Sequence, residues 1–386
     1  MLGQTKNIAI TNFFGALHYF LTIYIVSPHL AEFMGESAIG LVFAAGALLS
    51  LLGFVLLPQI LKKIPLKRVA QILTVIQIGV LTALALSNSI LIVVIAVILL
   101  SAIPALIGYS LDVFLEQATE GEDNTGSSRG FFIAVGNIAL VISPLAVGYI
   151  LGDTNEYGKI FALAAATLFP FLVLLSTIIH AKDVPKKLET LSLRRTLRCL
   201  MHSKDVMLGA SAHLVMLLFF SWVGIYIPLY LHTELGIAWE SLGWVFSVML
   251  LPYLLLEFPI GIAADKWFGE REIMMGGFAI MGIALALVGF ISIPLVTVFL
   301  VAVLISTRIG GAMVEITTET YFFKHVDGSD INSISLFRML RPLGALIGPL
   351  IGSFVLLFIS LQSAFIVLGA ICLLGIPLAF FIKDTR

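Results

Sequence analysis

Three charged residues inside one apolar stretch are the first candidates for chemistry. The stretch begins near Val296 and contains Arg308, Glu315 and Glu319. On a helix that turns about 100° per residue, the three side chains fall within a stripe of about 40°. A charge in membrane hydrocarbon costs about 2.5–3.5 kcal/mol on insertion scales, so it persists by pairing or by lining water. The stripe could therefore bind protons or substrate, or could form ion pairs that hold a gate closed.

Further ionisable side chains lie in other apolar stretches. Asp112 and Glu116 are four residues apart and share a helix face, and their stretch carries no basic residue. A carboxylate in a low dielectric is a natural proton carrier. Glu257 lies in another apolar stretch, and His18 and His213 titrate closest to physiological pH. Each histidine could carry a proton or could be a packed, hydrogen-bonded residue of a helix.

Amide and aromatic side chains add uncharged candidates for a binding site. Asn12 and Asn137 could contact a substrate or could bond two helices together. Tyr19, Trp222 and Tyr226 could line a cavity, or could serve helix packing. The same alternatives apply to Tyr24.

The composition identifies the environment of all these residues as a membrane. Hydrophobic residues make up 60% of the 386 residues and charged residues 12%, and the mean hydropathy is +1.09. A soluble domain is about 45–50% apolar and about one quarter charged. The excess occurs in runs of about 20 residues, the length at which a helix spans a bilayer. We therefore predict an all-α membrane protein.

Twelve membrane-spanning helices are expected from these runs. The first six cover residues 8–28, 38–58, 67–86, 90–112, 130–151 and 160–180. The last six cover residues 207–231, 241–263, 273–291, 296–318, 333–355 and 363–382. The polar and basic residues 181–204 form a predicted cytoplasmic linker, so the domains are expected to be 1–180 and 205–386.

The distribution of positive charge predicts the orientation in the membrane. If the N-terminus is inside, the inner loops and ends hold eighteen of the twenty-two Lys and Arg residues, and the outer loops hold only Lys159. Inner loops of membrane proteins carry an excess of Lys and Arg. The protein is therefore predicted to be a multi-pass protein of the cell membrane with both termini in the cytoplasm.

The two halves repeat each other at a nearly constant offset. The segment "ESAIGLVF" from Glu36 corresponds to "ESLGWVF" from Glu240, and Gly40 precedes Gly243 by 203 residues. The pairs Asp112/Glu315 and Glu116/Glu319 share that offset, while "SPLAVG" and "GPLIGS" are 205 residues apart. This agreement favours two pseudo-symmetric six-helix bundles, an organisation in which transporters bind substrate between their repeats.

With this layout the chain resembles the major facilitator superfamily over nearly its whole length. The most specific motif is "GIAADKWFGERE", which is similar to the family's loop motif at a cytoplasmic gate. The resemblance assigns the gate to Gly261, Asp265, Lys266, Gly269 and Arg271. A small residue at such a turn lets two helices approach closely.

Other parts of the family pattern are matched only in part. The first-half loop "PQILKKIPLKRV" has Pro58 and Lys62 where the second half has glycine and aspartate. "GALIGPLIG" resembles the glycine–proline motif of the family's proton-driven antiporters. Arg338 and Arg341, three residues apart on the same predicted span, complete the expected gate. We expect Asp265 to lie within reach of one of these arginines or of that helix's N-terminus.

The resemblance implies a secondary active transporter that works by alternating access. We predict proton coupling and favour efflux of amphipathic compounds, because the predicted spans are rich in aromatic residues and poor in amides. The alternatives are an uncoupled facilitator, an importer of a small organic anion or a sugar, and a membrane receptor or scaffold that transports nothing.

The sequence carries none of the motifs typical of a membrane enzyme or an ATP-driven pump. It has no phosphate-binding P-loop, no HExxH and no CxxC cluster. We therefore predict no catalytic residue, cofactor or metal. The expected partners are a small-molecule substrate, protons and the lipid bilayer, with no nucleic acid, and the expected state is a monomer.

Overall fold

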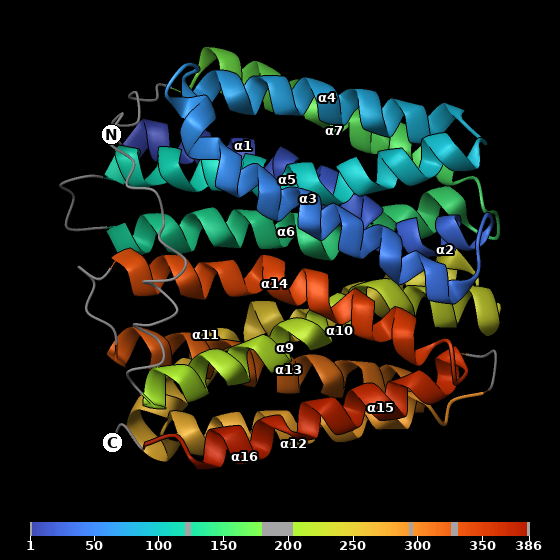
Figure 1. The fold of residues 1–386 in the computed structure, drawn as a ribbon, viewed down its shortest axis with the longest axis vertical. Helices are drawn as coiled ribbons and strands as arrows, with labels where there is room; N and C mark the ends of the chain where they lie inside the picture. The colour runs from blue at the N-terminus through green and yellow to red at the C-terminus, as the bar shows by residue number, and fades with distance from the viewer. Residues whose placement is uncertain (1, 120–124, 180–203, 293–295, 326–330, 384–386) are drawn as a thin grey trace. The chain divides into compact units, whose positions relative to one another are not determined.

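A computed structural model describes residues 2–119, 125–179, 204–292, 296–325 and 331–383 (Figure 1). Helices are the only regular elements in these ranges. The helices of the first half are α1 (Leu2–Thr22), α2 (Val26–Ala31), α3 (Glu36–Leu61), α4 (Leu66–Leu86), α5 (Ile90–Thr119), α6 (Thr125–Leu151) and α7 (Tyr157–Thr177).

The second half repeats this organisation with more interruptions. Its elements are α9 (Lys204–Pro228), η1 (Leu229–Glu234), α10 (Trp239–Leu255), α11 (Glu257–Ala263), η2 (Ala264–Phe268), α12 (Glu270–Val288), α13 (Val298–His325), α14 (Ile331–Val355), α15 (Leu361–Leu373) and α16 (Gly375–Phe380). The short elements η1 and η2 are π-helical turns that continue α9 and α11.

Each of the twelve predicted spans contains a helix or a pair of helices. Within the described part of the chain, ten helices are long and apolar enough to cross a membrane. A pair bent by 40°, α10 with the segment Pro259–Phe268, makes an eleventh, and α14 contributes the shorter apolar segment Met339–Val355. The prediction of an all-α, multi-spanning fold is confirmed.

Proline and glycine account for several of the helix boundaries. Pro65 precedes α4 with φ −57°, a conformation that proline favours at a helix start. Pro228 ends the α-helical part of α9, and the π-helical η1 follows it directly. Gly269 separates η2 from α12 at φ +80°, a backbone conformation that strains residues with a Cβ.

The chain divides into two compact units, which are described separately. Unit 1 comprises residues Met1–Gly35, Ala45–Glu189 and Ala238–Ser247. In it α1 packs against α5, α6 and α7, and α4 packs against α5 and α7, as Figure 1 shows for α4 and α7.

Unit 2 comprises Glu36–Ala44, Thr190–Ile237 and Val248–Arg386. There α9 packs against α13, α14, α15 and α16, and α12 packs against α13 and α15. These pairs repeat those of unit 1: α1 with α6 corresponds to α9 with α14, and α4 with α7 corresponds to α12 with α15. The packing therefore repeats as the sequence offsets predict, while the domain boundaries at the linker remain a prediction.

One helix crossing occurs in both units at corresponding positions. In unit 2, a Cβ at Gly40 would lie 2.5 Å from the carbonyl oxygen of Pro349. In unit 1, a Cβ at Gly243 would lie 2.6 Å from the carbonyl oxygen of Pro144. Only glycine lets the backbones approach this closely, so the glycines that revealed the repeat in the sequence are contact points of the fold.

Candidate functional site

Arg308 lies in the interior of unit 2, and none of the described carboxylates forms an ion pair with it. The residue is 4% exposed and sits in the central part of α13. Its guanidinium carbon lies 5.7 Å from the ring centroid of Phe219 on α9, a cation–π contact. Nε has no hydrogen-bond partner, and no ion pair joins Arg308 to any described residue. Among the described residues, the Phe219 ring is therefore the contact recorded for this buried guanidinium.

Two aromatic side chains approach α13 closely at Gly311, one turn after Arg308. A Cβ at Gly311 would meet the hydroxyl of Tyr253 at 2.5 Å and the Phe219 ring at 3.2 Å. Tyr253 on α10 and Phe219 on α9 therefore reach the same turn of α13 as Arg308. Gly310 faces the other way, since a Cβ there would lie 2.6 Å from the carbonyl oxygen of Gly277 on α12. Neither Phe219 nor Tyr253 was among the predicted site residues, because a lone aromatic in an apolar run has no distinguishing pattern.

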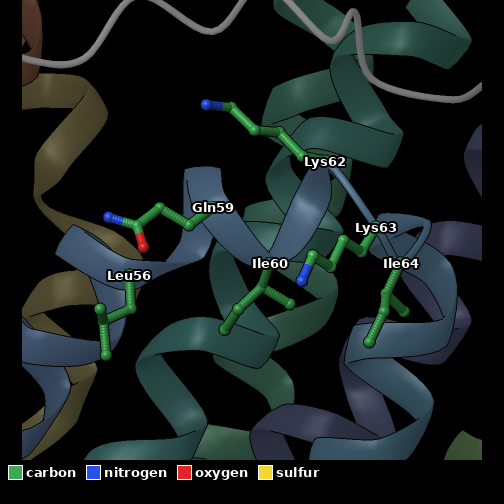
Figure 2. A pocket seen from close by; sticks show the side chains of 6 residues that line it. All are labelled: Leu56, Gln59, Ile60, Lys62, Lys63 and Ile64. Carbon is green, nitrogen blue, oxygen red and sulfur yellow. The ribbon is translucent and has the colours of Figure 1, made fainter.

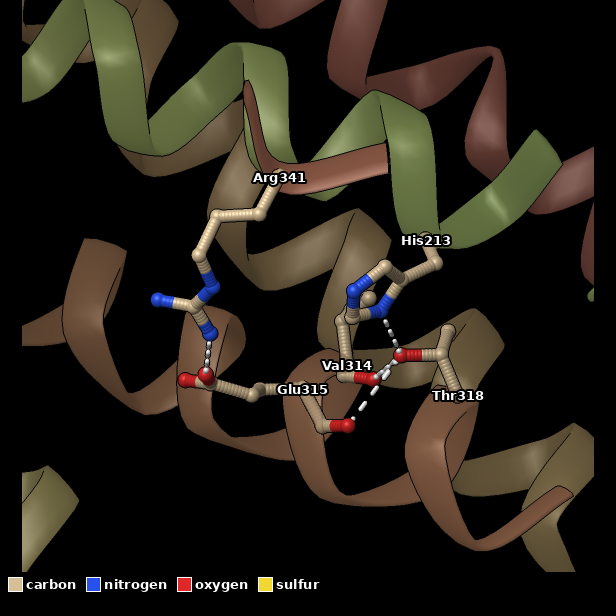
Figure 3. A network of polar contacts seen from close by, with 5 residues as sticks. All are labelled: His213, Val314, Glu315, Thr318 and Arg341. Atoms are coloured by element: carbon tan, nitrogen blue, oxygen red, sulfur yellow. Dashed lines mark hydrogen bonds and ion pairs between the residues drawn. The ribbon is translucent and has the colours of Figure 1, made fainter. Parts of the chain in front are cut away.

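Glu315 forms a different environment two turns along α13 (Figure 3). Its carboxylate accepts a hydrogen bond from Nη2 of Arg341 on α14 at 3.5 Å, with the two side chains 21% and 67% exposed. Glu315, predicted as part of the charged stripe, is thus paired with Arg341, predicted as part of the gate. Glu319, the third member of the stripe, is half-buried.

His213 is tied to the same helix. Its Nδ1 lies 2.9 Å from the hydroxyl of Thr318, which also bonds the carbonyl oxygen of Val314 at 2.8 Å. The imidazole packs on Phe337, with ring centroids 4.3 Å apart. His213, about two and a half turns from the start of α9, thereby contacts both α13 and α14, which no spacing in the sequence indicated.

The predicted loop gate is only partly within the described residues. The backbone at Gly269 requires a glycine, and Lys266 is exposed. Arg271 pairs with its neighbour Glu272 at 2.7 Å. At Gly261 the nearest described atom to a Cβ, on Ile316, is 3.9 Å away, and the expected close approach of two helices stays a prediction.

Three predicted side chains lie outside the described part of the structure. They are the side chains of Glu257, Asp265 and Arg338. The expected contact between Asp265 and an arginine or the N-terminus of α14 therefore stays a prediction.

An ion pair at the start of α12 was missed by the sequence analysis. Glu270 is 1% exposed and pairs with Lys324 near the end of α13. Its position at the first residue of a helix is also favourable for a negative charge. In the sequence, Glu270 directly follows Gly269 of the loop motif. A carboxylate at that place has the pattern of an exposed turn residue, so its burial was not predicted.

The predicted residues of unit 1 occupy varied positions. Asn12 donates to the carbonyl oxygen of Phe132 at 3.2 Å and so bonds α1 to α6. His18 is buried, and neither ring nitrogen has a hydrogen-bond partner among the described residues. Asp112 is half-buried and Glu116 exposed on α5.

Asn137 is half-buried on α6, and Tyr19 is partly exposed on α1 beside Phe20. In unit 2, Trp222 donates to the carbonyl oxygen of Gly348 at 2.7 Å, and Tyr226 packs edge-on against it. Trp222 therefore joins α9 to α14. Roles of these residues in a substrate or proton path stay predictions.

Unit 1 contains a concavity of about 570 Å³ at the end of α3 (Figure 2). It lies at the loop whose first-half motif departs from the family pattern. Its lining consists of Leu56, Gln59, Ile60, Lys62, Lys63 and Ile64. The two lysines give it a positive charge where the corresponding second-half loop has an aspartate.

A second titratable pair lies on α2 in unit 1. Nδ1 of His29 lies 3.1 Å from the Glu32 carboxylate, and the rings of Tyr157 and Phe161 pack against the imidazole. Burial raises the pKa of the Glu32 carboxyl above its usual value. Among the described residues, no group of three or more His, Cys, Asp or Glu side chains could hold a metal.

The fold and this site define a class of multi-spanning helical transporter built from two repeated bundles. Residues 209–386 match the sequence profile of the Major Facilitator Superfamily. Two crystal structures of the nucleoside transporter NupG, one of them of a point mutant, superpose with TM-scores of 0.77 and 0.76 at 16% and 15% identity. Each match covers 98% of both chains. The sequence profile of the major facilitator superfamily thus matches the second half of the chain, residues 209–386, while the solved structures share the fold of the whole chain.

A curated relative is similar over part of the chain. It is a probable sulfoacetate transporter, SauU, of Cupriavidus necator, 33% identical over 154 residues. The match covers 39% of this chain and 35% of that protein. The proteins matched are named as transporters, so the prediction that this chain is not an enzyme is confirmed on that ground.

Proposed function

We propose that this protein is a secondary transporter that carries a small organic anion across the cell membrane by alternating access. The observation that supports the substrate class is Arg308, a buried guanidinium without a carboxylate partner among the described residues. Arginine keeps its charge in proteins, so it cannot relieve burial by deprotonating. An anionic group of the substrate supplies the missing counter-charge.

The chemistry around Arg308 suits a compact anion with a polar end. The planar guanidinium can bind a carboxylate or a sulfonate through two parallel hydrogen bonds. The Tyr253 hydroxyl, one turn away beside Gly311, can contact a second oxygen. The name of the relative SauU gives sulfoacetate, an organic anion, as its substrate.

The sequence alone favoured efflux of amphipathic compounds. An amphipathic substrate without negative charge would leave Arg308 unneutralised, so the anion is the better-supported proposal. Proton coupling remains part of the proposal, with His213 and Glu315 as the carriers in unit 2. The predicted cytoplasmic termini and monomeric state are retained as proposals.

Uptake into proteoliposomes tests the substrate class. The purified protein is supplied with labelled sulfoacetate, with uridine as a neutral nucleoside and with an amphipathic cation, each with and without an imposed pH gradient. We expect saturable uptake of sulfoacetate alone, stimulated by the gradient.

The matched variants are Arg308→Gln and Arg68→Gln, the latter an exposed arginine on α4. The Arg308 variant should lose sulfoacetate uptake while the Arg68 variant keeps it. Equal uptake of sulfoacetate by both variants, or transport of uridine or the cation instead, contradicts the proposed substrate class.

A further inference from the structure

The contact between His213 and Thr318 restricts where the imidazole can hold a proton. The hydroxyl of Thr318 lies 2.8 Å from the carbonyl oxygen of Val314, 3.1 Å from that of Glu315 and 2.9 Å from Nδ1 of His213 (Figure 3). A hydroxyl has one proton to donate and two lone pairs to accept with. If the Thr318 hydroxyl donates to one of these carbonyl oxygens, which only accept, its proton points to the backbone of its own helix.

This leaves a lone pair of Thr318 facing Nδ1, so Nδ1 must carry a hydrogen. A neutral imidazole has one N–H, and the other nitrogen is then an acceptor. The neutral ring is therefore the Nδ1–H tautomer, and Nε2 holds the free lone pair. The His213 side chain as a whole is 3% exposed. Its Nε2 atom is not both fully buried and without a hydrogen-bond partner.

The charges nearest to Nε2 come from the ion pair described above. Figure 3 shows this nitrogen on the side of the ring turned toward Arg341, whose charge acts on the imidazole. The Arg341–Glu315 contact is long for a charged hydrogen bond, at 3.5 Å. A proton on Nε2 would place a second cation beside Arg341 and in competition for the same carboxylate.

The other ionisable groups on elements packed against α9 complete this environment. On α13 the described ones besides Glu315 are Arg308, Glu319, Tyr321 and Lys324, and on α15 the one such group is Cys372. The described segment of α16 has none. The element η1 carries Tyr230, His232 and Glu234 at the opposite end of α9. On α9 itself, Lys204 and Asp205 lie about two turns before His213.

We propose that Thr318 is a positioning residue that holds His213 as the Nδ1–H tautomer, so that Nε2 binds the coupling proton and shifts Glu315 away from Arg341. A hydronium ion supplies the proton: its O–H bond breaks, an N–H bond forms at the Nε2 lone pair, and a water molecule is left. The imidazolium then attracts Glu315 and repels Arg341, which loosens the link between α13 and α14. Proton coupling is taken from the proposed function, whereas the tautomer is a property of the resting protein.

Nitrogen-15 NMR of the full-length protein, labelled at histidine and held in lipid nanodiscs, tests the tautomer directly. His213 is assigned with a His213→Gln sample. We expect a protonated Nδ1 and an unprotonated Nε2 in the neutral ring. Thr318→Val, which keeps the shape but removes the hydroxyl, should lower the tautomer ratio about threefold to tenfold, the change that one hydrogen bond supports. Thr318→Ser should restore it.

An Nε2–H tautomer in the wild-type protein, or an unchanged ratio in Thr318→Val, overturns the inference. The link to the ion pair is tested by following the His213 signal against pH. In Glu315→Gln the transition should move to lower pH, since the carboxylate that attracts the imidazolium is gone. An unmoved transition overturns the proposed competition for Glu315.

Transport supplies a readout that a purely structural hydroxyl would not change. The pH profile of proton-driven uptake should shift in Thr318→Val and return in Thr318→Ser. A uniform loss at every pH assigns Thr318 to packing and overturns its positioning role. Failure of the wild-type protein to transport sulfoacetate contradicts the proposed function, whereas the NMR results stand or fall separately.

Discussion

Arg308 and Arg341 are two arginines of unit 2 with opposite surroundings. Arg308 is almost fully buried, stacks over Phe219 and has no carboxylate beside it among the described residues. Arg341 is two-thirds exposed and contacts Glu315 across two helices. Arg308 therefore has no ion pair among the described residues. Arg341 is paired with Glu315 and is also exposed at the protein surface.

This contrast shows why intramembrane charge has to be interpreted through burial and partners. A buried charge without a partner is unfavourable for the fold, which is why Arg308 supports the proposed anionic substrate. An exposed pair gains little from pairing because water solvates both partners, so it can separate and form again at small cost. Such a pair suits a conformational change better than it suits stability.

Arg308 should show the largest effect. Loss of a buried charge that binds an anion costs about 2–5 kcal/mol in comparable interfaces, so Arg308→Gln should lower the kcat/KM of anion uptake about 100-fold. Arg308→Lys keeps the charge but loses the planar fork and should be impaired less. Rates in proteoliposomes measure this, with detergent size-exclusion profiles as the control for folding. Unchanged kinetics in both variants would assign Arg308 to packing.

Glu270 and Lys324 combine one buried and one half-exposed partner, and their effect should be on stability. Lys324→Gln leaves the Glu270 carboxylate buried without that lysine, which should cost about 1–3 kcal/mol of unfolding free energy. The double variant Glu270→Gln/Lys324→Gln should recover part of the loss. Denaturant unfolding in mixed micelles measures both, with Lys63→Gln as the exposed control. Additive losses in the double variant would show that the two side chains do not interact.

The Glu315–Arg341 pair should affect rate rather than stability. Glu315→Gln and Arg341→Gln are each expected to change uptake about threefold to tenfold, with unfolding altered by less than about 1 kcal/mol. Exchange of the two residues, Glu315→Arg with Arg341→Glu, should restore part of the rate. Because salt screens exposed charges, the difference between variant and wild type should shrink at high ionic strength. A salt-independent difference would point to a buried role instead.

The smallest effect is expected at Glu156 and Lys159, an exposed pair at the start of α7. Their side chains are 57% and 56% exposed. Removing either should change the unfolding free energy by less than about 0.5 kcal/mol and leave uptake unchanged. Denaturant unfolding and transport of Lys159→Gln measure this. A loss of unfolding free energy comparable to that of Lys324→Gln would show that burial does not determine how much these ion pairs contribute to stability.

Much of the fold follows from local patterns in the chain. Twelve apolar runs predicted the helices because a bilayer allows a continuous, internally hydrogen-bonded segment of about 20 residues and few alternatives. The repeat was visible because Gly40 and Gly243 are each required by a tight crossing. The π-helical turns η1 and η2 and the bend between α10 and α11 were not foreseen, since they depend on how neighbouring helices accommodate the chain.

The candidate site was predicted less completely. Helical periodicity placed Arg308, Glu315 and Glu319 on one stripe, and the cost of burying charge marked that stripe as functional or gating. The sequence could not assign Arg341 to Glu315, Thr318 to His213 or Phe219 to Arg308. Those contacts join residues 26, 105 and 89 positions apart.

The sequence by itself determined that this protein is surrounded by a membrane, where along the chain its apolar helices lie, and which residues are costly to place in them. These properties depend on composition and on residue spacing along one helix, and both can be obtained from the amino-acid sequence. Only the tertiary structure decided that Arg341 contacts Glu315, that Arg308 has no ion pair among the described residues, and that Nδ1 of His213 lies against Thr318. Those outcomes depend on distances between helices, because an electrostatic interaction or a hydrogen bond is made or lost within a few ångströms.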